Sequence, residues 1–163
     1  MVGIDVSAET IYAWLAAVPD PEIPVLSITD LGIVREVIVN GGVTVALAPT
    51  YSGCPATEVI EQSVLDKLHS KGLKDVAIER RLSPPWTTDW ITDGAREKLR
   101  EYGIAPPARA SGKRALLGGN RAIACPRCGS LESTLVSQFG STACKAAYRC
   151  EDCLEPFEYF KCI

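Results

Sequence analysis

The stretch IVREVIVNGGVTVALAPTYSGCP, residues 33–55, determines the fold predicted for the N-terminal part of the chain. Asn40-Gly41-Gly42 separates two runs rich in Val and Ile, and Asn and Gly readily adopt the positive φ of a tight hairpin turn. The runs 33–39 and 43–47 are therefore predicted to be two antiparallel strands. The second strand leads into Gly53-Cys54-Pro55, where a helix is expected to begin because proline suits the first helical position.

Further elements are expected on both sides of this hairpin, from the spacing of apolar residues and from capping residues such as Ser7. The predicted elements are helices at 7–18 and 55–72, a strand at 76–82 and a last helix that closes at Gly103. The predicted fold class is thus a small α/β (α+β) domain with the order α-β-β-α-β-α and a small mixed sheet. This domain is expected to span residues 1–103.

The remaining sequence predicts a linker and a metal-binding module. Residues 104–122 combine Pro, Gly and basic residues without periodicity, which is typical of a linker. Two C-x-x-C pairs follow, Cys125 with Cys128 and Cys150 with Cys153. This spacing is typical of a zinc ribbon, in which four thiolates bind Zn²⁺ tetrahedrally. Residues 123–163 are therefore predicted to form a zinc-ribbon-like module with structural zinc, and disulfides are the less favoured alternative in a reducing compartment.

Three of the seven cysteines lie outside these pairs. Cys144 and Cys162 exceed the four positions of one zinc site, and they are either small buried hydrophobes or additional thiols that ligate iron transiently or transfer sulfur. Cys54 lies where a strand ends and a helix begins, and the positive end of a helix dipole favours a thiolate. It is therefore a candidate functional thiol, with a structural cysteine as the alternative.

The Pro-rich loop before the hairpin contains carboxylates that could gather around a cation or a cysteine. The candidates are Asp20, Glu22 and Asp30, although carboxylates in loops are usually only solvated. The sequence contains no Walker loop, no G-x-G-x-x-G and no zincin helix. A Cys-His-Asp triad would need His69, the single histidine, which is expected on the polar side of its helix. No catalytic residue is therefore predicted.

Composition limits the classes of partner. The chain has 163 residues, of which 47% are hydrophobic, and a formal net charge of −3. No apolar run approaches the roughly 18 residues that span a bilayer, and the start MVGIDVSAETIYAW lacks the features of a signal peptide. No dense basic stripe interleaved with aromatic residues is present. The sequence thus predicts a cytoplasmic protein that binds neither membranes nor nucleic acid.

Four blocks of the sequence resemble the PaaD family, whose members are encoded with the multicomponent phenylacetyl-CoA epoxidase of bacterial phenylacetate degradation. The blocks are residues 18–37, 49–56, 83–91 and 139–162. The N-terminal part is also similar to a wider domain family of iron-sulfur targeting and assembly factors. The signature of that family, a DPE loop and the cysteine of a GCP turn, matches Asp20-Pro21-Glu22 and Cys54. The resemblance implies that Cys54 is the working thiol and that the two carboxylates support it.

The resemblance also implies a function. It indicates a non-catalytic accessory protein that matures or inserts an iron-sulfur or iron centre in a partner subunit, with iron or a cluster bound transiently. The implied partners are the epoxidase subunits, especially the iron-sulfur flavin reductase, and the iron-sulfur assembly machinery. One alternative is a structural or electron-transfer subunit of the epoxidase. Another is a thiol enzyme that uses Cys54, which is ranked last because no histidine base lies nearby in sequence.

Overall fold

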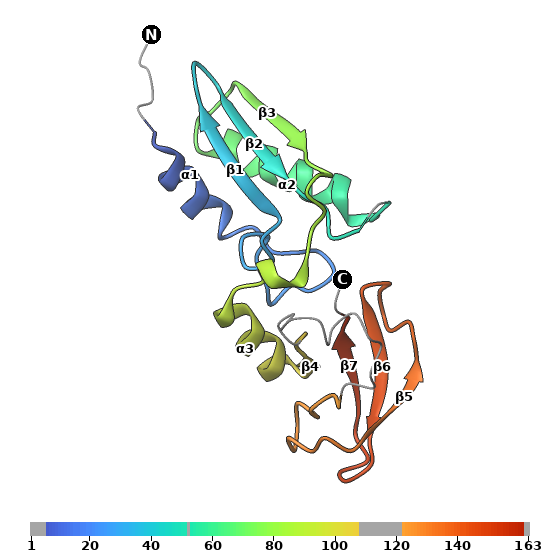
Figure 1. Ribbon diagram of the computed structural model, residues 1–163. Coiled ribbons are helices and arrows are strands. Elements are labelled where there is room, and N and C mark those ends of the chain that lie inside the picture. The colour runs from blue at the N-terminus through green and yellow to red at the C-terminus, as the bar shows by residue number, and fades with distance from the viewer. Residues whose placement is uncertain (1–5, 52, 108–121, 162–163) are drawn as a thin grey trace. The chain divides into compact units, whose positions relative to one another are not determined.

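The computed structural model describes residues 6–51, 53–107 and 122–161. The chain divides into two compact units, Met1–Trp90 and Ile91–Ile163, which are considered separately below. The division precedes the last helix, whereas the domain limit expected from the sequence was residue 103, and that limit stays a prediction. The first unit contains α1 (Ala8–Leu15), β1 (Val34–Val39), β2 (Val43–Leu47), α2 (Ala56–Ser70), β3 (Val76–Arg80) and the short 3-10 helix η1 (Thr88–Trp90) (Figure 1).

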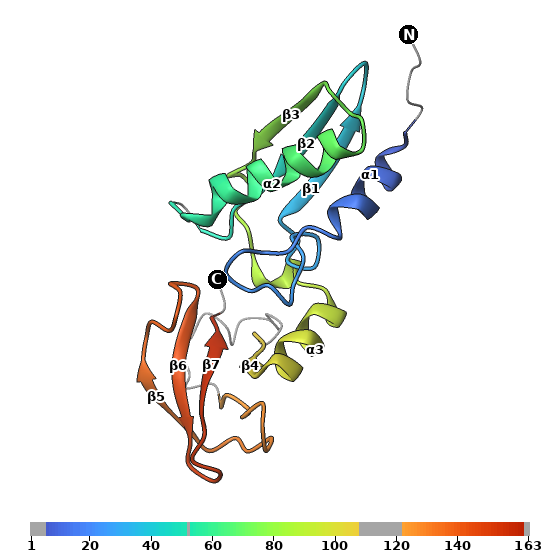
Figure 2. The same cartoon turned by 180° about the vertical axis from the view of Figure 1, so that it is seen from behind.

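The predicted hairpin and the mixed sheet are confirmed. β1 pairs with β2 antiparallel, and β2 pairs with β3 in parallel, so the strand order is β1-β2-β3. The turn at residues 40–42 is tight: the Asn40 N–H donates to the carbonyl of Gly42 at 3.0 Å, and Gly41 has a φ of +71°. Figure 2 shows α2 lying across one face of this sheet.

The apolar faces of the two helices form much of the core of this unit. In α1, Ile11 and Leu15 have 0% exposure, and the Ser7 hydroxyl caps the helix by accepting from the Thr10 N–H. In α2, the buried positions are Ala56, Ile60, Val64 and Leu68. Leu82, which the alternating pattern placed in the third strand, instead lies beyond β3 and is 63% exposed.

The Pro-rich loop between α1 and β1 is a packed part of the core. A β-bridge joins Pro19 to Ser27, and the Asp20 N–H donates to the carbonyl of Leu26 at 2.8 Å. Four apolar side chains of the loop are at most 2% exposed: Ile23, Leu26, Ile28 and Leu31. Burial of these side chains fixes the loop without a regular element, and it thereby fixes the positions of the loop carboxylates.

The segment around the two later tryptophans packs onto the end of this loop. Trp86 is buried, and its indole N–H donates to the Leu31 carbonyl at 2.8 Å. The Arg35 guanidinium lies 3.5 Å from the centroid of the Trp90 ring, a cation–π contact. Gly32 has a φ of +68°, and a Cβ atom there would lie 2.7 Å from both Cβ and the carbonyl oxygen of Trp90. Only glycine permits this close approach.

We expect Gly32→Ala to destabilise the protein more than Gly41→Ala. Both glycines have a similar positive φ, of +68° and +71°, but nothing lies within 4 Å of a Cβ built at Gly41. Both variants therefore lose about 1 kcal/mol of stability from backbone strain. The clash with Trp90 increases the loss by about 1–3 kcal/mol in the Gly32 variant alone. Urea unfolding followed by tryptophan fluorescence measures the difference. Equal losses in the two variants would show that Trp90 moves aside at little cost.

The second unit is an α-helix followed by a four-stranded sheet. Its elements are α3 (Asp93–Tyr102), β4 (Ile104–Ala105), β5 (Ser133–Ser137), β6 (Lys145–Cys150) and β7 (Pro156–Phe160). The strand order is β4-β7-β6-β5, in which β5, β6 and β7 are antiparallel and β4 runs parallel to β7. α3 ends at Gly103, as predicted, with a left-handed φ of +95°. It completes the predicted order α-β-β-α-β-α.

The first two residues of the predicted linker form a strand. Ile104 and Ala105 form β4 and are 4% and 1% exposed, because they pair with β7 and add apolar surface to the core of the second unit. Residues 108–121 of the predicted linker lie outside the described part of the chain. No helix within the described residues is long and apolar enough to cross a membrane.

Candidate functional site

The two C-x-x-C pairs form two turns with the same backbone pattern. The Cys125 N–H donates to the carbonyl of Ser130 at 2.8 Å, and the Cys150 N–H donates to the carbonyl of Glu155 at 3.0 Å. In each turn the residue after the second cysteine is left-handed: Gly129 has a φ of +77° and Leu154 a φ of +62°. Glycine at residue 129 adopts this conformation without steric conflict, whereas in leucine at residue 154 the Cβ atom makes it unfavourable.

These turns bring the four predicted ligands together. The Sγ atoms of Cys125 and Cys153 are 3.8 Å apart, and those of Cys128 and Cys150 are 3.5 Å apart. All four sulfur atoms lie within 4.8 Å of one another. Tetrahedral Zn–S bonds of about 2.3 Å place sulfur atoms about 3.8 Å apart, whereas a disulfide needs about 2.05 Å. The four thiols therefore form a site for one tetrahedral metal ion.

Two of the four thiols, those of Cys150 and Cys153, have pKa values shifted in opposite directions. The backbone N–H of Cys153, whose nitrogen lies 3.5 Å from the Cys150 sulfur, favours the Cys150 thiolate and lowers the pKa of Cys150 to about 7. The N–H of Glu155 also favours a thiolate at Cys153, but burial and the three neighbouring thiols outweigh it and raise the pKa of Cys153 to about 12. Four thiolates so close together need a cation to neutralise their repulsion.

The two remaining cysteines of the C-terminal part lie outside this cluster or outside the described residues. Cys144 is 4% exposed, and its sulfur lies 3.1 Å from the Thr142 hydroxyl. Its burial agrees with the interpretation of a small core residue. Cys162 is not among the described residues.

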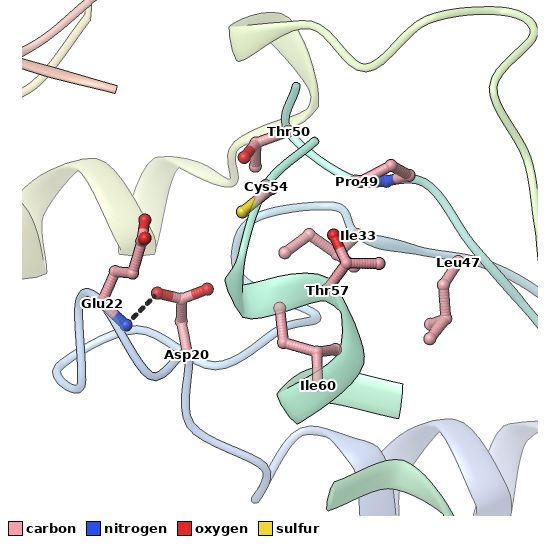
Figure 3. A pocket seen from close by; sticks show the side chains of 9 residues that line it. All are labelled: Asp20, Glu22, Ile33, Leu47, Pro49, Thr50, Cys54, Thr57 and Ile60. Atoms are coloured by element: carbon pink, nitrogen blue, oxygen red, sulfur yellow. Dashed lines mark hydrogen bonds between the residues drawn. The ribbon is translucent and has the colours of Figure 1, made fainter. Parts of the chain in front are cut away.

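Cys54 and the two predicted carboxylates line one pocket in the first unit. The pocket contains nine residues: Asp20, Glu22, Ile33, Leu47, Pro49, Thr50, Cys54, Thr57 and Ile60. Figure 3 shows the Cys54 sulfur directed toward the side of the pocket where the carboxylates of Asp20 and Glu22 lie. The cavity volume is about 20 Å³, which is room for about one water-sized group. The site can therefore enclose a single ion or atom but no large substrate.

Cys54 lies in the turn that leads into α2. Its N–H donates to the Tyr51 carbonyl at 3.3 Å, and its own carbonyl accepts from the Thr57 N–H at 3.1 Å. The N-cap of α2 is Pro55, which provides no side-chain hydrogen bond to the first turn. The half-buried thiol thus lies at the start of α2, as the sequence predicted for the GCP turn, and no side chain caps that start. Pro55, expected at the first helical position, is instead the N-cap, and the helix begins at Ala56.

Asp20 is more than a solvated loop carboxylate. It is 6% exposed, and its Oδ1 accepts from the N–H groups of Glu22 and Ile23 at 2.9 and 2.8 Å. These bonds fix the Asp20 carboxylate at the pocket, and Glu22 lines the same pocket. Asp30, in the same loop, accepts from the Ser27 N–H at 3.1 Å but does not line the pocket. The two aspartates therefore have similar structural roles and different positions.

A second, larger hollow also includes Cys54 in its lining. It has a volume of about 490 Å³, and its lining includes Cys54, Pro49, Thr57, Arg80 and Leu82. The thiol therefore borders both a small cavity and a larger one. Sequence reasoning did not identify Thr50 and Thr57 as lining residues. For Thr57 the available signal was its position three residues after Cys54, at the first turn of the helix.

Comparisons with known families match the two halves of the chain separately. Residues 8–79 match a family described as iron-sulfur cluster assembly protein, and residues 109–161 match a family described as PaaD zinc beta ribbon domain. Two solved structures resemble the chain in fold. A domain of unknown function from Bacillus anthracis has a TM-score of 0.54 at 26% identity and covers 56% of this chain and 90% of its own. A conserved hypothetical protein from Thermotoga maritima has a TM-score of 0.50 at 27% identity and covers 58% of this chain and 94% of its own.

Two relatives resemble the chain in sequence. A protein of Escherichia coli (strain K12), described as a candidate component of 1,2-phenylacetyl-CoA epoxidase, is 54% identical over 94% of this chain and 92% of its own length. An Fe-S protein maturation auxiliary factor of Porphyromonas gingivalis (strain ATCC BAA-308 / W83) is 39% identical over 56% of this chain and 89% of its own length. The first relative therefore spans both units, whereas the second spans little more than half of the chain.

Proposed function

The chain belongs to the PaaD family, and from this membership we propose that it is a non-catalytic accessory protein of phenylacetyl-CoA epoxidase. Its task is to mature an iron-sulfur or iron centre in another subunit of that enzyme. The names of its relatives support both halves of the proposal, because one is described as an epoxidase component and the other as a maturation factor.

The observation that carries the proposal is the shared pocket of Cys54, Asp20 and Glu22. A thiolate is a soft ligand and a carboxylate a hard one, and iron accepts both. The cavity of about 20 Å³ suits one ion or one cluster atom and offers no space for an acyl-CoA. The second cavity, of about 490 Å³, gives a client access to the same sulfur from outside. Iron or a cluster is thus the cargo, held only until a partner takes it.

The C-terminal cysteine site has a different task in this proposal. Four protein thiolates complete a tetrahedral zinc ion and leave no position open for a substrate or water, which is the arrangement of a structural site. We assign zinc to this site as the metal that stabilises the second unit. Arg149, which the sequence places beside Cys150, forms an ion pair with Glu151 at 3.2 Å, so its charge is balanced by that carboxylate.

The proposed partners follow from the chemistry of the cargo. The flavin and iron-sulfur reductase is the epoxidase component that needs a cluster, and the general iron-sulfur assembly machinery is the source. Both belong to the cytoplasm, where thiols stay reduced. A structural or electron-transfer subunit remains the alternative function, and it differs in requiring a permanent redox centre in this chain.

Deletion of the chain tests the proposal. The reductase and the oxygenase are purified separately from a strain that lacks the chain and from the same strain carrying the wild-type copy. We expect the reductase from the deletion strain to contain several-fold less iron and acid-labile sulfide per polypeptide, with its flavin retained. If both enzymes contain their full complement of metal, the chain does not mature either centre.

A further inference from the structure

The small cavity and the larger hollow at Cys54 have three lining residues in common. These are Pro49, Cys54 and Thr57, and no other described residue lines both spaces. The two spaces differ greatly in size, with volumes of about 20 Å³ and about 490 Å³. A group that moves directly from one space to the other therefore passes these three side chains.

The two spaces also differ in the exposure of their walls. Every residue that lines only the larger hollow is exposed: Gly53, Pro55, Glu58, Arg80 and Leu82. Most residues that line only the small cavity are buried, namely Asp20, Ile33, Leu47 and Ile60. An ion at the carboxylates thus reaches solvent either through the larger hollow or past the half-buried side chains of Glu22 and Thr50.

Of the three shared residues, Thr57 is the one whose side chain can open or close the passage. Cys54 supplies the sulfur of the proposed site. Pro49 has a rigid ring, and it follows Ala48, which is buried and donates its N–H to the Ile33 carbonyl at 2.8 Å. Thr57 is half-buried in the first turn of α2, and a threonine in a helix divides between two χ1 rotamers. It can therefore turn without any movement of the backbone.

The backbone of α2 keeps Thr57 close to the thiol. The Thr57 N–H donates to the Cys54 carbonyl at 3.1 Å, and Ile60 anchors the same turn of the helix by its burial. Figure 3 shows the Thr57 side chain on the side of Cys54 that faces away from the carboxylates of Asp20 and Glu22. An ion that leaves the carboxylates past the sulfur therefore meets Thr57 next.

We propose that Thr57 is a steric gate of the Cys54 site, and that the size of its side chain sets how fast a single ion passes between the small cavity and the larger hollow. The inference rests on the proposed function, because the ion is the cargo of that site. On release the metal–sulfur bond breaks with its electron pair left on the Cys54 sulfur, which stays a thiolate or takes a proton from water. The ion keeps its oxidation state, and Thr57 does not bind it.

A gate has a kinetic signature that a ligand lacks. The ion crosses the same barrier when it binds and when it leaves, so a lower barrier raises both rates by the same factor and leaves Kd unchanged. Loss of a ligand instead raises the release rate and Kd together. Thr57→Ala removes both groups on Cβ and should raise both rates at least about tenfold, whereas Thr57→Val keeps the branched shape and should stay within about threefold of the wild type.

Stopped-flow absorption with Co²⁺ as the probe measures these rates, since Co²⁺ accepts thiolate and carboxylate ligands and absorbs light when bound to sulfur. The full-length, zinc-loaded protein is mixed with Co²⁺, and a chelator then removes the ion while zinc content is monitored. Cys54→Ser should abolish the absorption, which assigns it to this thiol. Val59→Ala is the matched control, because Val59 is also a β-branched residue of α2, is 52% exposed and lines neither space. It should leave both rates unchanged.

The outcomes separate the gate from the ion site itself. Equal rates in Thr57→Ala and Val59→Ala would overturn the gate and leave the ion site intact, with the ion leaving past Glu22 or Thr50. A higher Kd in Thr57→Ala with an unchanged binding rate would also overturn it, because Thr57 would then be a ligand. Equal acceleration by Thr57→Val and Thr57→Ala would overturn a steric gate. Absence of cobalt–sulfur absorption at Cys54 would contradict the proposed ion site and the gate together.

Discussion

Removal of zinc is expected to unfold the second unit, Ile91–Ile163, from residue 123 onward and to leave the first unit, Met1–Trp90, folded. The core around the metal site is small and includes two of the ligands. Its buried members are Ala105, Ile123, Cys125, Cys150, Phe157 and Tyr159. So few side chains provide little hydrophobic stabilisation, whereas a four-thiolate zinc site contributes about 10–16 kcal/mol at neutral pH. Loss of the ion therefore removes more free energy than the rest of the module provides.

A chelator titration followed by amide NMR of the full chain measures this effect. The amide signals of residues 123–161 should collapse toward random-coil positions, while those of residues 6–90 should keep their dispersion. Elemental analysis before chelation should give about one zinc per chain and little iron, because the structural assignment requires a metal without redox chemistry. A stoichiometric iron content with visible absorption would instead favour the electron-transfer alternative.

Cysteine variants separate the role of the metal from that of packing. Cys150→Ser removes a ligand and should abolish stable zinc binding. Cys144→Ser is the matched control, because Cys144 is also buried in the second unit but lies outside the four-sulfur cluster. It should lose about 1–2 kcal/mol of stability from the polar replacement and keep its zinc. A folded, dispersed spectrum for zinc-free Cys150→Ser would contradict the structural role of the metal.

The parts of the fold that the sequence predicted well depend on short-range signals. The hairpin follows from the turn residues at 40–42, the helix starts from caps such as Ser7, and the metal cluster from the spacing of two C-x-x-C pairs. Each of these patterns acts within a few residues along the chain. They could therefore be recognised before any tertiary contact was known.

Long-range contacts account for the differences between sequence and structure. Ile104 and Ala105 resemble the start of a linker in sequence, and only β7, some fifty residues later, makes them a strand. Asp20 resembles a solvated carboxylate, but burial of the surrounding loop holds it against the pocket. The pairing of Asp20 and Glu22 with Cys54 came from family resemblance, because no periodicity links a loop to a helix start thirty residues away. Their common pocket supports this pairing, and its function stays a prediction.

Cys54→Ser is expected to abolish the ability of the chain to restore epoxidase activity in a strain that lacks it. Serine is nearly isosteric with cysteine and keeps the backbone bonds of the turn, so folding and zinc content should not change. A hydroxyl, however, is a poor ligand for iron and is not ionised at neutral pH. The Cys54 variant therefore tests thiol chemistry rather than packing. Cluster content of the reductase is the direct readout, and epoxidase activity the functional one.

The carboxylates of the loop allow a sharper comparison, because Asp20 and Asp30 both cap backbone N–H groups and only Asp20 lines the Cys54 pocket. Asn retains an oxygen that can accept these bonds, so Asp20→Asn and Asp30→Asn should be similarly stable. We expect Asp20→Asn to reduce reductase cluster content about tenfold, because the site loses one negative charge facing the cation, and Asp30→Asn to leave it near the wild-type level. Full complementation by Cys54→Ser would show that the thiol is dispensable. Equal defects in the two aspartate variants would show that the loop acts through its shape and that the Asp20 charge does not serve the metal.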